Sequence, residues 1–64
     1  MKDYLVEAKI NNETTLALYY EQKANAIKKF SSLVKSKKYT EVRIVYLPSL
    51  YYEKSVRVLD YWRK

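Results

Sequence analysis

The fold of this chain is decided by residues 40–47, whose sequence is TEVRIVYL. In an extended conformation one side of this segment carries Val42, Ile44 and Tyr46, and the other carries Glu41, Arg43, Val45 and Leu47. A period of two residues is typical of a strand with one buried face. Pro48 follows, and it ends the strand because proline has no backbone N–H to donate. We therefore predict a strand over residues 40–47.

The segment before this strand changes period. When residues 21–36 are placed at 100° steps, one side carries Ala24, Ala26, Ile27, Phe30, Leu33 and Val34. The other side carries Gln22, Asn25, Lys28, Lys29, Ser32, Lys35 and Ser36. This pattern predicts one amphipathic helix. Its basic end, Lys35 with Lys37 and Lys38, suits the negative pole of the helix dipole, at roughly 0.3 to 1 kcal/mol per charge.

A hairpin is predicted at the N-terminal end of the chain. Residues 4–10 alternate, and Asn11-Asn12-Glu13 indicates a turn, because asparagine tolerates positive φ in a chain that has no glycine. Residues 15–20 alternate again and are rich in strand formers. A competing interpretation extends the helix back to Thr14, since Leu16 and Tyr20 keep a helical spacing with the residues that follow. Lys23 falls within that apolar seam and argues against this longer helix.

A last strand is predicted over residues 55–63. Alternation there places Val56, Val58 and Trp62 towards the helix, and Arg57, Leu59, Tyr61 and Arg63 on the opposite face. Asp60 interrupts the inward pattern, which indicates a bulge, an edge position or a hydroxyl partner. The element order is therefore ββαββ. We predict a single α+β domain over residues 1–64, with a four-stranded, mainly antiparallel sheet and one amphipathic helix packed on one face.

The composition argues against catalysis and cofactor binding. The 64 residues include no Cys, His or Gly. Disulfides, Cys/His zinc sites, thiol nucleophiles, imidazole bases and glycine-rich phosphate loops are therefore excluded. The seven carboxylates are scattered and show no paired spacing. We expect no enzyme activity, no cofactor and no metal, and a small domain that is stabilised by packing or by self-association.

The N-terminal residues contain no apolar stretch long enough for a signal peptide or a membrane span. A cytoplasmic protein without membrane contact is expected. The lysine-rich, glycine-free composition resembles that of small proteins from low-GC bacteria and their phages, and on this ground we expect a phage or mobile-element protein.

Eight tyrosines and a net charge of +6 point to a binding surface. Tyr4, Tyr20 and Tyr46 share the side of the apolar residues. The face away from the helix collects basic and aromatic side chains together with Val45 and Leu59: Lys9, Tyr19, Arg43, Arg57, Tyr61 and Arg63. Single-stranded nucleic acid is bound by such surfaces, because bases stack on aromatic rings while cations neutralise phosphates. Our leading hypothesis is therefore a small basic nucleic acid-binding protein.

Two other interpretations of the same face remain open. Cross-strand ion pairs of Glu7 and Glu41 with Lys9, Arg43 and Arg57 would leave it merely solvated. Alternatively, its apolar residues form a protein-protein interface, as in a small phage-encoded inhibitor or adaptor that binds a host protein or nucleoprotein complex, or a homodimer.

Two further features could contact a partner. A secondary basic stripe on the helix exterior comprises Lys28, Lys29, Lys35, Lys37 and Lys38. Lysines on an outer helix face are usually just solvated, but this stripe would track the phosphates of a duplex. Tyr51 and Tyr52 are adjacent in the loop after Pro48. Because neighbouring residues of an extended chain point to opposite sides, at least one of them is predicted to be exposed.

Overall fold

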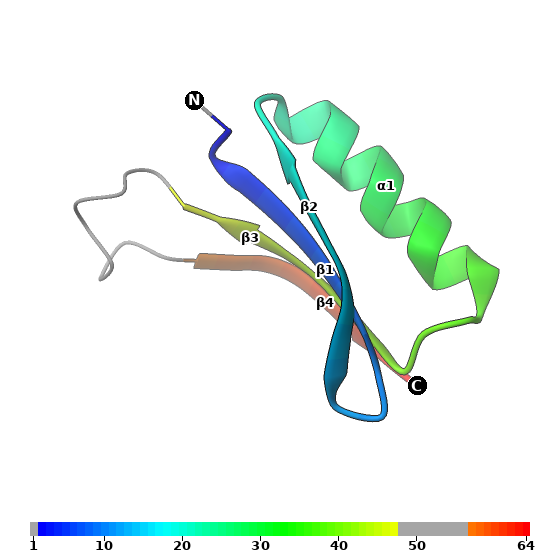
Figure 1. Ribbon diagram of the computed structural model, residues 1–64. Helices are drawn as coiled ribbons and strands as arrows, with labels where there is room; N and C mark the ends of the chain where they lie inside the picture. Colours follow the sequence, from blue (N-terminus) through cyan, green and yellow to red (C-terminus); the bar gives the residue numbers. More distant parts are fainter. Residues whose placement is uncertain (1, 48–56) are drawn as a thin grey trace.

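A computed structural model describes residues 2–47 and 57–64 and shows a ββαββ domain (Figure 1). The elements are β1 (Tyr4–Ile10), β2 (Glu13–Tyr20), α1 (Lys23–Ser36), β3 (Glu41–Tyr46) and β4 (Arg57–Arg63). The strands form one antiparallel sheet in the order β2-β1-β3-β4, so β2 and β4 are its edges. The helix packs on one face, as the sequence predicts.

The first hairpin is closed by two asparagines in the left-handed region. Asn11 has φ 51° and Asn12 has φ 71°, and the flanking residues Ile10 and Glu13 pair with each other. Asparagine is the best available substitute for glycine in such a turn. Residues 13–20 form a strand throughout, so the interpretation as a longer helix is wrong.

An unpaired residue, Thr15, bulges from β2. Lys9 pairs with Thr14, whereas Ala8 pairs with Leu16, and the Thr15 hydroxyl donates to the Ala8 carbonyl oxygen at 3.3 Å. The bulge leaves the strand regular from Leu16 onward.

The helix ends without a glycine. Lys37 takes the left-handed conformation at φ 58° that glycine usually adopts after a helix, and its N–H donates to the Val34 carbonyl oxygen. The Ser36 hydroxyl donates to the Leu33 carbonyl oxygen at 2.7 Å, which satisfies another carbonyl of the last turn. The helix therefore stops three residues before Tyr39, which packs against the core.

The core lies between α1 and the two central strands. Its buried members are Val6, Ala8, Ala26, Phe30, Leu33, Val42 and Ile44. Tyr4, Leu16, Tyr20, Val34 and Trp62 pack around them and are half-buried. The apolar stripe of α1 is wider than this core, since Ile27 keeps 46% of its surface exposed and Ala24 is exposed as well.

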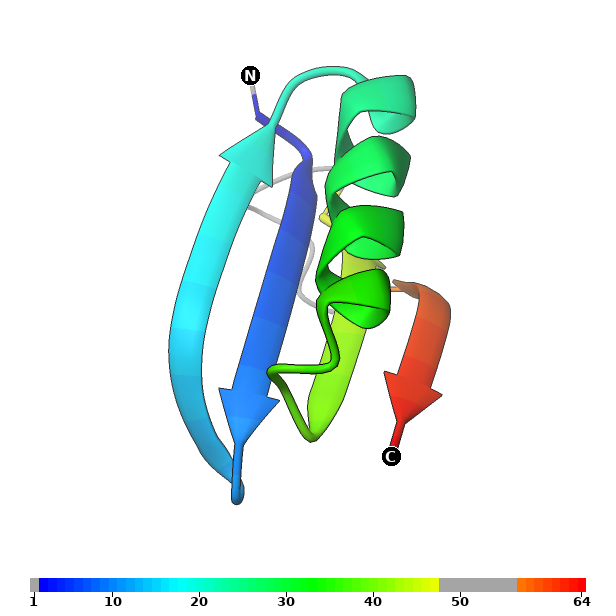
Figure 2. The same ribbon diagram turned by 90° about the vertical axis from the view of Figure 1, so that its right-hand side faces the viewer.

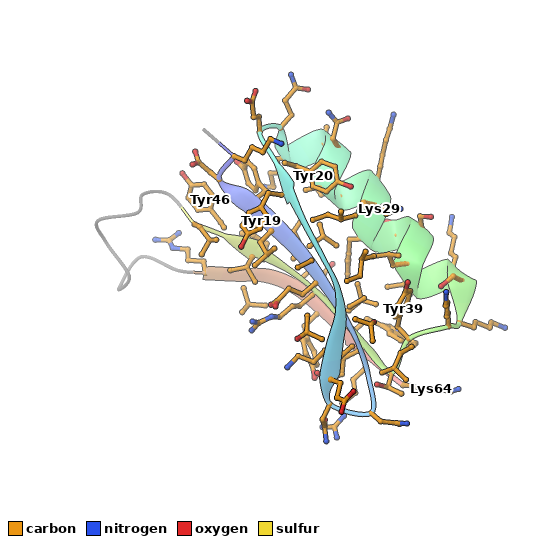
Figure 3. All side chains as sticks on the ribbon, viewed as in Figure 1. Tyr19, Tyr20, Lys29, Tyr39, Tyr46 and Lys64 are labelled. Atoms are coloured by element: carbon orange, nitrogen blue, oxygen red, sulfur yellow. The ribbon has the colours of Figure 1, made fainter. Side chains whose placement is uncertain are left out.

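Tyrosines divide between the two faces as their parity predicts. Figure 3 shows Tyr20 on the helix side of β2 and Tyr19 on the opposite side. Tyr4 and Tyr46 lie on neighbouring strands with ring centroids 5.2 Å apart, a typical spacing for an aromatic pair.

Thr40 joins the segments that meet at one end of the sheet. Its N–H and its hydroxyl both donate to the Lys9 carbonyl oxygen, at 2.8 and 3.0 Å. The same hydroxyl accepts from the Asn11 N–H at 3.0 Å, and the Thr40 carbonyl oxygen accepts from the Lys64 N–H at 2.9 Å. One residue thus ties the β1–β2 turn and the end of β4 to the start of β3, and all three lie at the lower end in Figure 1.

Candidate binding surfaces

The face of the sheet away from α1, here called the outer face, is organised in three rows that run across the strands. The first row, from β2 to β4, is Tyr19, Leu5, Val45 and Val58. The second row is Ala17, Glu7, Arg43 and Tyr61, and the third is Thr14, Lys9, Glu41 and Arg63. The structure thus brings together Lys9, Tyr19, Arg43, Tyr61 and Arg63 on one face.

Ion pairs neutralise much of the charge of this face. The Arg43 guanidinium contacts the Glu7 carboxylate, its direct neighbour in the second row, with the Arg43 Nε donating a hydrogen bond. Glu41 lies between Lys9 and Arg63 in the third row, and its Oε1 is 3.8 Å from the Arg63 Nε. Cross-strand pairing of charges is therefore present for Arg43 and Arg63, while the Arg63 side chain is still 70% exposed.

The predicted faces of the first half of β4 are wrong. A register shift lies between Ile44 and Val45, so Leu59 is an extra residue and the alternation inverts before it. Val58 pairs with Val45 on the outer face. Arg57 pairs with Tyr46, whose position alternates to the helix side of the sheet, so Arg57 does not join the predicted site. Asp60 directly follows the bulge on an edge strand, as its place in the pattern indicates. Its carboxylate accepts from the Tyr61 N–H at 2.8 Å.

Exposed aromatic surface sits at the two edges of the outer face. Tyr19 on β2 and Tyr61 on β4 are 53% and 48% exposed. Between them, Val45 on β3 is only 3% exposed although it faces away from the helix. The outer face therefore combines a small apolar centre with two exposed rings and a set of mostly paired charges.

A second surface, which sequence reasoning missed, is a groove between α1 and β4. Figure 2 shows α1 in front of the central strands, with β4 out to its side. The groove has a volume of about 590 Å³, and its apolar lining includes Ile27, Phe30, Val34, Ile44, Leu59 and Trp62. Lys23, Lys35 and Asp60 also line it. The exposed part of the helix stripe could have indicated it, because Ile27 lies about 100° from Ala26 around the helix and cannot share its burial fully.

The lysines of the predicted stripe do not form one surface. Lys28 and Lys35 are both exposed, but Lys35 also lines the groove beside β4. Lys29 is half-buried and lies 100° round the helix from Lys28. Lys37 and Lys38 are exposed beyond the last helical turn, and the Lys38 Nζ lies 5.9 Å from the centre of the Tyr39 ring. Figure 3 shows Lys29 on the helix and Lys64 at the lower end of the domain.

The predicted Tyr51 and Tyr52 contact, like the inward position of Val56, lies outside the described residues. Within residues 2–47 and 57–64, no set of three or more metal-binding side chains is gathered in one place. No helix in the described part of the chain has the length and apolar character needed to cross a membrane. The sequence matches no family model, and comparisons with curated proteins and with solved structures found no match.

Proposed function

We propose that this protein is a small basic binding module without enzymatic activity, and that it binds single-stranded nucleic acid on its outer face. The observation that carries the proposal is the pair of exposed rings, Tyr19 and Tyr61, which project from the two edge strands of a face that α1 does not cover. Bases stack on such rings irrespective of sequence, at roughly 1 to 3 kcal/mol per base.

The ion pairs of the outer face indicate which interactions would bind a single strand. Because Glu7 and Glu41 accompany Arg43 and Arg63, the face offers few cations that are free to bind phosphates. Stacking should therefore contribute more to affinity than charge does. A contact with one or two phosphates has a log-log salt slope of roughly −0.7 to −1.4, so raising salt fourfold should weaken binding only about three- to sevenfold.

Fluorescence anisotropy with labelled single-stranded and duplex oligonucleotides tests the proposal, over salt concentrations from about 50 to 200 mM. We expect the single strand to bind more tightly, and Tyr61→Ala or Tyr19→Ala to weaken binding at least about fivefold, the lower end for one stacked base. Lys28→Ala with Lys35→Ala is the matched control on the helix and should leave the affinity nearly unchanged. No binding at the low-salt end would exclude the proposal.

Glu7→Gln provides a gain-of-function check. The substitution removes the charge that holds Arg43 and leaves the shape of the side chain intact. We expect tighter binding and a steeper salt slope, by about one phosphate. A steep slope in the parent protein that disappears in the Lys28 and Lys35 variants would instead assign binding to the helix exterior and to a duplex.

A second function is favoured by the groove between α1 and β4. Its apolar lining suits a protein partner, consistent with an inhibitor or adaptor of phage origin that binds a host protein or nucleoprotein complex. In pull-downs from a host lysate, Ile27→Glu should abolish capture of such a partner. Ala24→Glu places the same charge on an exposed helix position outside the groove and should not. Unchanged capture by both variants would rule out the groove.

The cytoplasmic location and the homodimer predicted from the sequence belong to this proposal as well.

A further inference from the structure

From Leu16 onward, the edge strand β2 lacks the features that normally keep a sheet edge from pairing. Within residues 2–47 and 57–64 its one neighbouring strand is β1, so half of its backbone groups point outward along the edge. Residues 14–20 have the sequence TTLALYY, with no charge and no proline. Soluble proteins usually protect such an edge with lysine, proline or a bulge. The bulge at Thr15 protects only the first part of the strand and leaves residues 16–20 regular.

The regular part of β2 is complementary to itself. In an antiparallel pair centred on Leu18, that residue meets Leu18 of the second copy, and Ala17 meets Tyr19 of the second copy. The small and large side chains then alternate on the outer face. On the helix side, Leu16 meets Tyr20 of the second copy, and both residues are half-buried in the single chain. Aromatic and aliphatic pairs of this kind contribute roughly 0.2 to 1 kcal/mol each.

The other edge argues against self-pairing. An antiparallel pair of β4 centred on Asp60 would place that carboxylate directly against its own copy. Like charges directly opposite one another destabilise a strand pair. β2 has no comparable conflict, because its regular residues are uncharged.

We propose that two copies of this protein associate through β2, in an antiparallel pair centred on Leu18 that joins their sheets into one of eight strands. Because α1 lies over β1 and β3, the two helices would be about four strand spacings, or roughly 19 Å, apart. Packed helices are 8–10 Å apart, so the strands and not the helices make the contact. The half-buried Lys29 can then remain solvated in each copy.

This inference does not rest on nucleic-acid binding, and it goes beyond it by naming the interface and its register. Pairing of one short strand is a smaller contact than the ~800 Å² per partner of a standard interface, so we expect a dissociation constant in the micromolar range. Two copies would share one outer face, with both Tyr19 rings near the two-fold axis.

Sedimentation equilibrium over about 1 to 300 µM protein tests the association, a range that brackets the expected constant. We expect a monomer–dimer equilibrium in the parent protein and at least a tenfold higher dissociation constant for Leu18→Lys. Leu59→Lys introduces the same charge on β4 and should leave the constant unchanged. A monomer at all concentrations would overturn the proposal, and so would a dimer that survives Leu18→Lys but not Leu59→Lys.

Cross-linking tests the register without relying on a charged variant. The chain has no cysteine, so a single Leu18→Cys substitution reports on one position. Residues directly opposite in an antiparallel pair have Cα atoms about 4.5 to 5.5 Å apart, which suits a disulfide. Leu18→Cys should oxidise to a covalent dimer much faster than Ala17→Cys, whose copy lies diagonally opposite. Equal rates, or a faster Ala17→Cys, would refute the register.

Discussion

Each of the two edge strands of this sheet contains a bulge, but the strands differ in charge and in burial. β2 is uncharged over seven residues, carries a bulge near its start, and has Leu16 and Tyr20 packed at the margin of the core. β4 is charged at both ends and in the middle, and nearly all of it is exposed. One small sheet thus carries two kinds of edge: β2 suits another strand, while β4 borders an open groove.

The largest change in the free energy of unfolding is expected at β4, the edge strand with fewer contacts to the core. Among the described residues of β4, only Trp62 packs against the core cluster, because α1 lies over the central strands and not over β4. Trp62→Ala should lower the free energy of unfolding by about 2 to 3 kcal/mol and expose β4 amides to exchange before those of β1. Urea unfolding and hydrogen exchange measure both.

Leu59→Ala is the matched control on the same strand. The side chain is 38% exposed and borders the groove, so its truncation should lower the free energy of unfolding by less than about 1 kcal/mol. If Trp62→Ala and Leu59→Ala lowered the free energy of unfolding equally, the stabilising contacts of β4 would be spread along the strand. The difference between β4 and β2 described above would then be wrong.

A smaller effect is expected on β2. Leu16→Ala removes a half-buried side chain that packs against the core, and we expect a loss of about 1 to 2 kcal/mol in the free energy of unfolding. The same variant should weaken dimerisation, because Leu16 meets Tyr20 of the second copy. Urea unfolding at a fixed low protein concentration measures the loss of stability separately from the loss of dimerisation. Thr14→Ala, which lies before the bulge, should change neither by much.

These contrasts show which parts of the fold could be predicted from the sequence. Alternation in β1, β3 and β2 depends on local pattern alone, and it correctly separated Tyr19 from Tyr20 and Val42 from Arg43. In β4 the charge of Asp60 signalled a bulge, but the pattern does not say which residue is extra. Placing the bulge at Leu59 inverts the residues before it, and Arg57 was lost from the predicted site for that reason.

The candidate sites were less predictable than the fold, because they depend on how elements meet. Cross-strand pairing of Glu7 with Arg43 was one interpretation that the sequence left open. Choosing it requires the β1–β3 register, which joins residues 36 apart in the chain. The groove depends on where α1 crosses the sheet, and no local pattern specifies that position. Exposed rings at Tyr19 and Tyr61 were predicted because each depends on the parity of a single strand.

A decrease of about 1 kcal/mol in the free energy of unfolding is expected at Thr40, which ties the β1–β2 turn and the end of β4 to the start of β3. Thr40→Val keeps the shape of the side chain but removes the hydroxyl that binds the Lys9 carbonyl oxygen and the Asn11 N–H. The bond from the Lys64 N–H to the backbone of residue 40 is unaffected by this change. Hydrogen exchange should therefore accelerate at Asn11 and remain unchanged at Lys64. Faster exchange at both Asn11 and Lys64 would mean that the Thr40 hydroxyl holds the end of β4 as well as the β1–β2 turn.

The smallest effect is a stabilisation at the turn that leads into β2. Asn12 has φ 71°, a conformation that glycine adopts without a steric penalty, and Asn-Gly is the preferred pair for a two-residue hairpin turn. Asn12→Gly should raise the free energy of unfolding by roughly 0.5 kcal/mol, because relief of strain slightly exceeds the entropy gained by the unfolded chain. Asn25→Gly makes the same exchange inside α1 and should lower stability by a similar amount. Thermal unfolding of both variants gives the comparison, and β4 amides should exchange as in the parent protein if the turn acts on β2 alone.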